Sequence, residues 1–237
     1  MKRVMMLSCV MCLVMTLSTA QAALNIDFGQ PDKPVQAGFE AFQANHEKAL
    51  ELYTPQNYSA FGAMVTLSLS WNPYLPDWRA MQMIDRGGND GSDTPDLLRD
   101  WTGTDGRSYG DPMTLTISGL PAGDYIWLSY HHDTEDQTGI FDVVVSDALG
   151  ERTFTGIDIS HGAKGAGIVN LADVTKFTTD LTSDGSDIAL VFSVVFGTEA
   201  PTAEKFFVMN GFELVPEPAT IALLGLGSLA LIRRRRS

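Results

Sequence analysis

The chain has 237 residues, and its 29 acidic residues outnumber its 16 basic residues, which gives a net charge of −13. This balance excludes a nucleic-acid-binding protein, because such proteins present clustered lysine and arginine to the phosphates. The two cysteines, Cys9 and Cys12, lie in an N-terminal segment that we expect to be removed. The remaining chain therefore has no disulfide, no thiolate chemistry and no cysteine zinc site.

The N-terminus has the three parts of a secretory signal peptide. Lys2 and Arg3 precede an apolar stretch at residues 4–17, and a small-residue A-x-A step ends at Ala22. The apolar stretch is shorter than the roughly 20 residues of a membrane-spanning helix. We therefore predict a signal peptide at residues 1–22 that is cleaved after Ala22. The alternative is a buried N-terminal helix.

The segment from residue 23 to residue 215 has the length of one domain with its own core. Loss of Lys2, Arg3 and the four arginines at 233–236 lowers the basic residues from 16 to 10, and the net charge becomes near −19 if Glu217 is retained. Such acidity is typical of a protein that stays soluble outside the cell. Binding of divalent cations is the alternative interpretation.

Short segments in which apolar and polar residues alternate follow one another through the body, and turn residues separate them. The expected strands are 24–28, 65–71, 113–117, 124–132, 141–145, 152–159, 188–196 and 206–214. The segment 188–196 is apolar on both faces, so we expect it to be central. Helix signals are limited to a short helix after Thr94 and Pro95, and to residues 44–53, which form a helix or a loop. The pattern predicts an all-β protein, a two-sheet antiparallel β-sandwich of the jelly-roll type.

Three segments of the body are similar to those of galactose-binding-like jelly rolls attached to exported bacterial proteins. They are a first strand at Asn25–Gly29, a last strand at Asn210–Leu214, and the turn and strand at Gly119–Tyr125. The resemblance implies a β-sandwich in which loops at one end bind glycans, sometimes with a structural calcium near the sheets.

Five aromatic residues lie between the second and third expected strands, namely Trp71, Tyr74, Trp78, Trp101 and Tyr109. Flat rings near loops can stack on sugar faces while polar neighbours bind the hydroxyl groups. We predict that these residues contact a glycan. The alternative is that the tryptophans close the ends of the hydrophobic core.

The expected strand 124–132 ends in two histidines. His131 and His132 point to opposite faces of a strand, so they do not ligate one metal ion together. We expect one to pack inside the sandwich and the other to face the loop, and we take His132 as a glycan-contacting residue.

Two acidic loops are candidate calcium sites, because calcium takes six to eight oxygen ligands. Asp133 and Asp136 lie in the first, and Asp85, Asp90 and Asp93 lie in the second. The second loop does not have the EF-hand spacing, because Gly91 at the sixth position would put Arg86 at the first. Solvated polar loops are the alternative for both.

The sequence has no Walker motif and no H-E-x-x-H, and its many acids single out no pair for glycoside hydrolysis. We therefore predict a protein without catalytic activity.

At the C-terminal end, Pro216, Glu217 and Pro218 precede an apolar segment at 219–232, and Arg233, Arg234, Arg235 and Arg236 follow it. A helix over this segment would be about 21 Å long, shorter than the roughly 30 Å hydrocarbon core. The arginines place that side in the cytoplasm, so the body lies outside.

This order of elements resembles the PEP-CTERM sorting signal of Gram-negative bacteria that make exopolysaccharide. The resemblance implies that an exosortase-type membrane protease recognises this sorting tail, at residues 216–237, cuts it near the Pro-Glu-Pro motif and removes it. The short transmembrane helix of the tail would then hold the protein at the membrane only transiently. A permanent anchor is the alternative.

Together these features predict a secreted or cell-surface protein that binds carbohydrate within exopolysaccharide. A purely structural matrix protein and a polysaccharide-cleaving enzyme remain alternatives, because the fold alone does not separate them.

Overall fold

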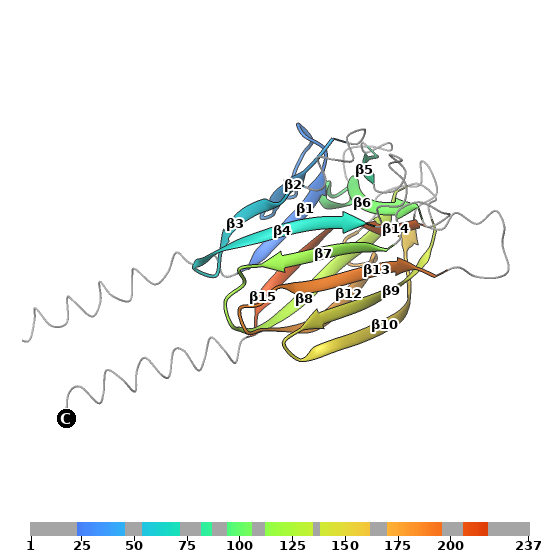
Figure 1. Ribbon diagram of the computed structural model, residues 1–237. Helices are drawn as coiled ribbons and strands as arrows, with labels where there is room; N and C mark the ends of the chain where they lie inside the picture. Colours follow the sequence, from blue (N-terminus) through green and yellow to red (C-terminus); the bar gives the residue numbers. More distant parts are fainter. Residues whose placement is uncertain are drawn as a thin grey trace, which may run out of the picture.

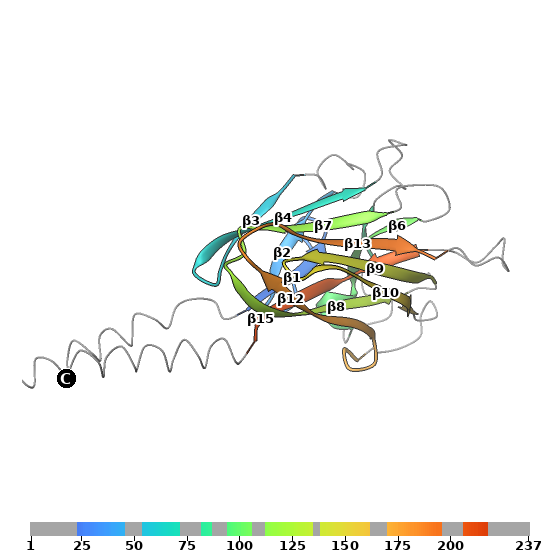
Figure 2. The same ribbon diagram turned by 60° about the horizontal axis from the view of Figure 1, so that its bottom comes forward.

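The computed structural model describes residues 23–45, 54–71, 82–86, 94–105, 112–134, 138–161, 170–195 and 206–217. These residues form two six-stranded sheets that pack face to face, with a third, three-stranded sheet at one end (Figures 1 and 2). The prediction of an all-β sandwich is confirmed. In this part of the chain no helix is long and apolar enough to cross a membrane. The predicted signal helix and C-terminal helix lie outside the described residues.

The first sheet contains both ends of the described body, and the order of its strands is β11–β8–β15–β1–β2, with β12 also paired to β8. β15 runs antiparallel to β1 and β8, whereas β2 is parallel to β1 and β11 is parallel to β8. The bounds are β1 (Leu24–Gly29), β2 (Glu40–Gln43), β8 (Gly123–Asp133), β11 (Ser160–His161), β12 (Thr175–Ser183) and β15 (Gly211–Pro216).

The second sheet is wholly antiparallel, in the order β10–β9–β13–β7–β4–β3. β13 is central, as predicted, but only one of its faces is buried, because Ala189, Val191 and Ser193 on the other face are partly exposed. The bounds are β3 (Gln56–Ala60), β4 (Ala63–Trp71), β7 (Met113–Ser118), β9 (Ile140–Asp147), β10 (Gly150–Asp158) and β13 (Ile188–Val194).

The third sheet has the order β14–β6–β5, with β5 at Gln82–Asp85, β6 at Asp100–Asp105 and β14 at Phe206–Met209. The predicted single strand at 206–214 is therefore divided, because Asn210 separates β14 from β15. The side-chain amide of Asn210 donates to the carbonyl of Asp100 at 2.8 Å and accepts the His132 amide at 2.7 Å. These two bonds fix the point at which the chain passes from the third sheet to the first.

The predicted helix after Thr94 and Pro95 is a single 3₁₀ turn, η1, at Asp96–Leu98. Leu97 and Leu98 are fully buried and belong to a small apolar cluster with Tyr130 and Val174 on the outer face of the first sheet. A Cβ atom at Gly211 would overlap the side chain of Leu97 and the backbone of Ile26, so glycine lets this turn approach the sheet.

The core between the two large sheets forms because apolar residues alternate with polar ones along each strand. Trp127 of β8 stacks on Phe212 of β15 with ring centroids 4.2 Å apart, and Phe28 of β1 contacts Phe42 of β2 at 5.3 Å. Leu67 of the second sheet is as fully buried as these rings are. Most of the predicted strands contribute to this core, but β2 was not predicted, and the predicted strand at 152–159 corresponds to β10, whose side chains are exposed or partly exposed.

Side chains of the second sheet close one edge of the first sheet. The Gln56 side-chain amide donates to the carbonyl of Gln43 at 2.9 Å and accepts the amide of the same residue at 3.4 Å. The Tyr58 hydroxyl donates to the carbonyl of Ala41 at 3.0 Å. These contacts use backbone groups of β2 that a further strand would otherwise bind, which protects the edge from pairing with other chains.

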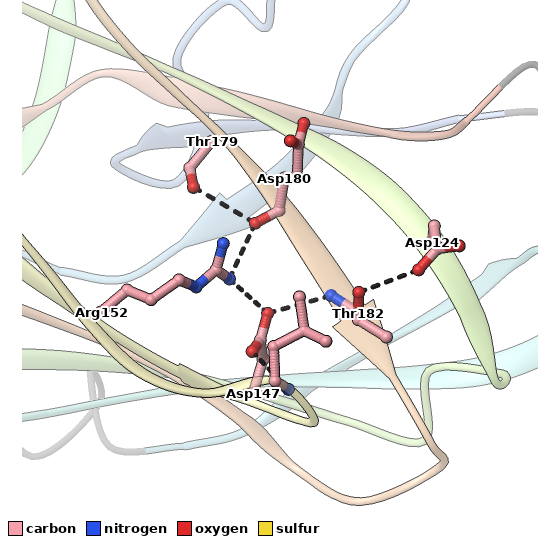
Figure 3. Close-up of polar contacts among 7 residues, drawn as sticks. Asp124, Asp147, Arg152, Thr179, Asp180 and Thr182 are labelled. Atoms are coloured by element: carbon pink, nitrogen blue, oxygen red, sulfur yellow. Dashed lines mark hydrogen bonds and ion pairs between the residues drawn. The ribbon is translucent and has the colours of Figure 1, made fainter.

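The opposite edge, β12, is closed by the β9–β10 hairpin (Figure 3). The Asp147 carboxylate accepts the Thr182 amide at 3.0 Å and a guanidinium N–H of Arg152 at 2.5 Å. Arg152 also donates to the carbonyl of Asp180 at 2.9 Å, and the Ala148 amide donates to the carbonyl of Thr182 at 3.0 Å. These contacts join the two large sheets.

The two ends of the described body lie side by side. Leu24, which begins β1, pairs with Leu214 of β15, and the Glu217 amide donates to the carbonyl of Asp124 at 2.9 Å. We call this end of the sandwich the base. The base also holds the β3–β4 turn, because Phe61 contacts Tyr125 of β8 with ring centroids 5.2 Å apart.

The opposite end of the sandwich we call the rim. The strands that leave the base end there, and the third sheet lies over it (Figure 1). Gly29 of β1, Asp133 of β8 and Trp71 of β4 mark the rim.

Candidate functional site

A buried ion pair holds the third sheet to the end of β8 at the rim. The Asp133 carboxylate, fully buried, accepts the Trp101 indole N–H and the Arg86 Nε–H, each at 2.9 Å. The Arg86 guanidinium also lies 5.4 Å from the centre of the Trp101 ring. One carboxylate thus joins β5, β6 and β8, and its negative charge is balanced by an arginine within the protein.

This geometry gives two of the predicted glycan-contacting aromatics interior positions. Trp101 is 0% exposed, and Trp71, paired with Met113 at the end of β4, is 8% exposed. A buried ring has no free face on which a sugar can stack. The positions of Trp71 and Trp101 therefore fit the alternative to glycan contact, in which the tryptophans close the ends of the hydrophobic core.

The other three predicted aromatics, Tyr74, Trp78 and Tyr109, lie outside the described residues. The segments that hold them are joined to the body through the ends of β4, β5, β6 and β7. The third sheet contains β5 and β6, and β4 ends at the rim. These three residues remain the predicted stacking residues.

Both histidines at the end of β8 are buried, so neither faces an open loop. His131 bonds to the Ser129 hydroxyl at 2.8 Å and to the carbonyl of Val208 at 2.7 Å, and burial lowers its pKa to about 4. His132 is 2% exposed and its Nδ1 lies 2.9 Å from the Ser160 hydroxyl. Burial also lowers the pKa of His132. Both rings are therefore neutral at pH 7.

A second polar cluster lies where β1, β5 and β6 meet at the rim. Asp85 pairs with Asp100 across β5 and β6, and Lys33 forms an ion pair with Asp85. Asp27 of β1 is 3% exposed and accepts the Gln36 amide at 2.7 Å, while Asp100 is 2% exposed. Asp27 Oδ1 and Asp100 Oδ2 have no hydrogen-bond partner among the described residues.

Burial dominates the protonation of this cluster. It raises the pKa of Asp100 to about 8, and the neighbouring carboxylates of Asp85 and Asp27 raise it further. Burial likewise raises the pKa of Asp27 to about 6, although the Gln36 amide opposes the shift. Asp100 is therefore mostly protonated at pH 7, which removes the cost of a buried, unbalanced charge.

Gly29 provides the space for this carboxyl group. A Cβ atom at position 29 would overlap Asp100 Oδ2. The absence of a side chain on β1 thus lets the carboxyl group of β6 lie against the backbone of the first sheet.

The candidate calcium ligands do not converge in the described part of the chain. Asp133 is paired with Arg86, and Asp85 with Lys33, while Asp90, Asp93 and Asp136 lie outside the described residues. The described residues contain no group of three His, Cys, Asp or Glu side chains suited to a metal ion. The described donors therefore do not fit calcium on their own.

Sequence reasoning missed Asp27, Asp100 and Arg86. A single charged residue in or beside a strand has no distinctive spacing. Asp27 approaches Asp100, and Arg86 approaches Asp133, only because distant strands lie next to each other. The sequence also contains Gly106-Arg-Ser-Tyr-Gly110, the spacing of a hydrolase nucleophile elbow. These five residues lie outside the described ones. The described elements that flank them are two strands, β6 and β7, whereas an elbow joins a strand to a helix.

Several solved structures are similar to this chain at low identity. One is TmCBM61 in complex with beta-1,4-galactotriose, at 15% identity and a TM-score of 0.34, covering 64% of this chain and 88% of that one. Another is the CBM35 from Cellvibrio japonicus Abf62, at 12% identity and a TM-score of 0.33, covering 63% of this chain and 92% of that one. A third is a family 35 carbohydrate binding module from Clostridium thermocellum, at 9% identity and a TM-score of 0.30, covering 69% of this chain and 99% of that one.

No curated protein sequence matches the chain. The family model described as the PEP-CTERM protein-sorting motif matches residues 214–236, which confirms the predicted sorting signal at Pro216–Pro218 and the arginines after it. The chain therefore carries a PEP-CTERM sorting motif, which indicates an exported protein of the cell envelope or surface of a Gram-negative bacterium.

Proposed function

We propose that the chain is a non-catalytic, exported β-sandwich that binds polysaccharide outside the cell through its rim. The observation that carries this proposal is the place of the sorting motif. The motif begins at residue 214 inside β15, and β15 ends at the base beside the start of β1.

While the tail is in the membrane, the base faces the membrane, because no linker separates β15 from the motif. The rim then faces away from the cell. The polysaccharide outside the cell is the partner that the rim meets first.

Binding would combine aromatic stacking with hydrogen bonds from polar loop residues. Tyr74, Trp78 and Tyr109 supply the rings, since Trp71 and Trp101 are committed to the core. The buried pair of Arg86 and Asp133 fixes the third sheet, whose strands β5 and β6 are connected in sequence to the segments of these residues. Fixed attachment points reduce the conformational entropy that a site loses when it binds.

The charge of the body selects among glycans. With the ends removed the net charge is near −19, so acidic polymers are repelled at low ionic strength. A neutral polysaccharide is therefore the favoured ligand. Calcium bound through Asp90, Asp93 and Asp136 would order the loops and reduce the repulsion, and we include it as one arm of the test.

The test is affinity gel electrophoresis of residues 23–217, which include every described strand, against neutral and acidic polysaccharides with calcium or with chelator. We expect retardation by a neutral polysaccharide, and we expect Trp78→Ala and Tyr109→Ala to lose most of it. Met64→Ala, at a site on the base that is 58% exposed, serves as the matched control and should bind normally.

Absence of retardation by every polysaccharide under both conditions would contradict the proposal. Self-association without any glycan preference would instead indicate a structural matrix protein. Release of reducing ends from a polysaccharide would indicate a cleaving enzyme.

A further inference from the structure

The sorting motif and the hydrophobic core share residues. The motif starts at Leu214, yet Leu214 is 0% exposed and pairs with Trp127 of β8 on one side and Leu24 of β1 on the other. The structure therefore leaves no linker between the folded body and the signal that directs its processing.

The last residues of β15 are held from one side only. β1 begins at Leu24, opposite Leu214, so among the described residues Val215 and Pro216 pair with β8 alone, at Ile126 and Tyr125. Beyond them the Glu217 amide donates to the carbonyl of Asp124 at 2.9 Å. The end of β15 is thus held in the sheet by its pairing with β8.

A protease usually binds its substrate as an extended strand, through the backbone groups of that strand. Those groups are already used where β15 pairs with β8. A cut N-terminal to Leu214 would remove a buried core residue, and it would require both neighbouring strands to separate. A cut beyond Pro216 requires only the release of the singly paired strand end.

We propose that the folded sandwich sets the processing site, so that the tail is cut C-terminal to Pro216 and the pairing of Val215–Glu217 with β8 slows the cut. This inference rests on the proposed function, since it assumes export and processing. In the reaction one peptide C–N bond breaks, and water supplies a hydroxyl group to the new carboxyl terminus and a proton to the new amine. The product keeps β15 intact.

The proposal makes processing depend on the state of the body. A chain that is still unfolded exposes Val215–Glu217, whereas a folded chain exposes these residues of the motif only when the strand end separates. Freeing the Pro-Glu-Pro segment from the sheet, with that segment and the tail after it unchanged, should therefore accelerate the cut.

The experiment uses the full chain in a host that makes the processing protease, followed by pulse–chase labelling and mass spectrometry of the mature C-terminus. The test variant carries Gly-Ser-Gly-Ser between Val215 and Pro216, which keeps the Pro-Glu-Pro motif and the tail unchanged. The control carries the same four residues in the exposed turn at Gly185, between β12 and β13. Thermal unfolding of both purified bodies checks that each insertion leaves the sandwich folded.

We expect the test variant to lose its tail several-fold faster than the natural chain and the control, and the natural product to end at Pro216 or later. Equal rates in all three chains would overturn the inference, and so would a natural product that ends before Pro216. Retention of the tail by all three chains in the presence of the protease would overturn this inference but not the proposed function, because an anchored sandwich can still bind polysaccharide and the electrophoresis above tests that binding separately.

Discussion

Leu24 and Leu214 lie opposite each other in neighbouring antiparallel strands, and both side chains are fully buried. The first and last strands of the body thus form one ladder at the middle of the first sheet. Since this pairing joins the two ends of the chain, the sheet is completed only after the C-terminal strand is available.

The first prediction concerns this pair. Leu214→Ala removes a fully buried side chain and leaves a cavity between β1, β8 and the core, so the free energy of unfolding should fall by about 2–5 kcal/mol. Urea unfolding followed by tryptophan fluorescence measures the change. Met64→Ala, at an exposed site, should change it by less than about 0.5 kcal/mol. Equal effects of the two variants would show that β15 is not part of the core.

A second prediction compares two arginines. Arg86→Met leaves the Asp133 carboxylate buried without a counter-charge, which should cost about 3–5 kcal/mol. Arg99→Met removes only an ion pair with Asp96 whose side chains are 31% and 38% exposed, so it should cost less than about 1 kcal/mol. The difference in urea midpoint between these variants measures the role of the buried pair. If the two variants lose similar amounts of stability, the pair of Arg86 and Asp133 does not have the role proposed for it, because Asp133 then finds another partner.

The sequence predicted many of the strands that face the core, although it missed β2 and β3, whose Phe42 and Tyr58 are buried. In β4 and β7 every second residue is apolar, and these two strands were recognised from Val65, Leu69 and Leu115. β12 was missed because its inward positions include the polar Thr179 and Ser183, which weaken the alternation. Period alone does not find a strand whose buried face contains hydroxyl groups.

The candidate site was less accessible to sequence reasoning. Trp101 was expected beside the short helix after Pro95, between two predicted strands, yet it lies in β6 of the third sheet and is fully buried. The carboxylates at Asp27 and Asp100 meet only because β1 lies next to β6, and that contact depends on the complete topology. Pairing between distant strands leaves no local signal.

The third prediction is a dependence of stability on pH. The pKa of Asp100 is raised by burial to about 8 from an ordinary value of 3.8. Between these values the unfolded chain has released the proton and the folded chain still holds it, so rising pH favours unfolding. The contribution of Asp100 is fully present below about pH 4, is lost progressively up to about pH 8, and is constant above that.

Asp100→Asn isolates this effect, because an amide does not titrate. We expect the variant and the natural protein to be about equally stable near pH 4, and the variant to be more stable at pH 8 by an amount on the order of a few kcal/mol. His131 also contributes to the pH dependence, because its lowered pKa makes the folded protein less stable as the pH falls below 6.5. This contribution is the same in both proteins, so subtracting one curve of stability against pH from the other removes it. A difference that stays constant from pH 4 to pH 8 would show that Asp100 is ionised throughout.

The fourth prediction concerns the closed edge at β12. Asp147→Ala leaves the Thr182 amide without this acceptor and removes the ion pair with Arg152, so the free energy of unfolding should fall by about 1–3 kcal/mol. Hydrogen exchange at the Thr182 amide should also accelerate. Asp142→Ala, which removes only the acceptor for the Gly156 amide, should leave exchange at Thr182 unchanged. Unchanged exchange in both variants would mean that the hairpin does not secure this edge.

The most direct test of the central claim is the distribution of the protein around cells that make it. The amount of natural chain and of Trp78→Ala is measured in the extracellular polysaccharide fraction and in the free medium. We predict that the natural chain is retained in the polysaccharide and that the variant moves into the medium with its tail equally processed. Equal retention of both chains would contradict binding through the rim, and retention of the natural chain inside the cell would contradict export.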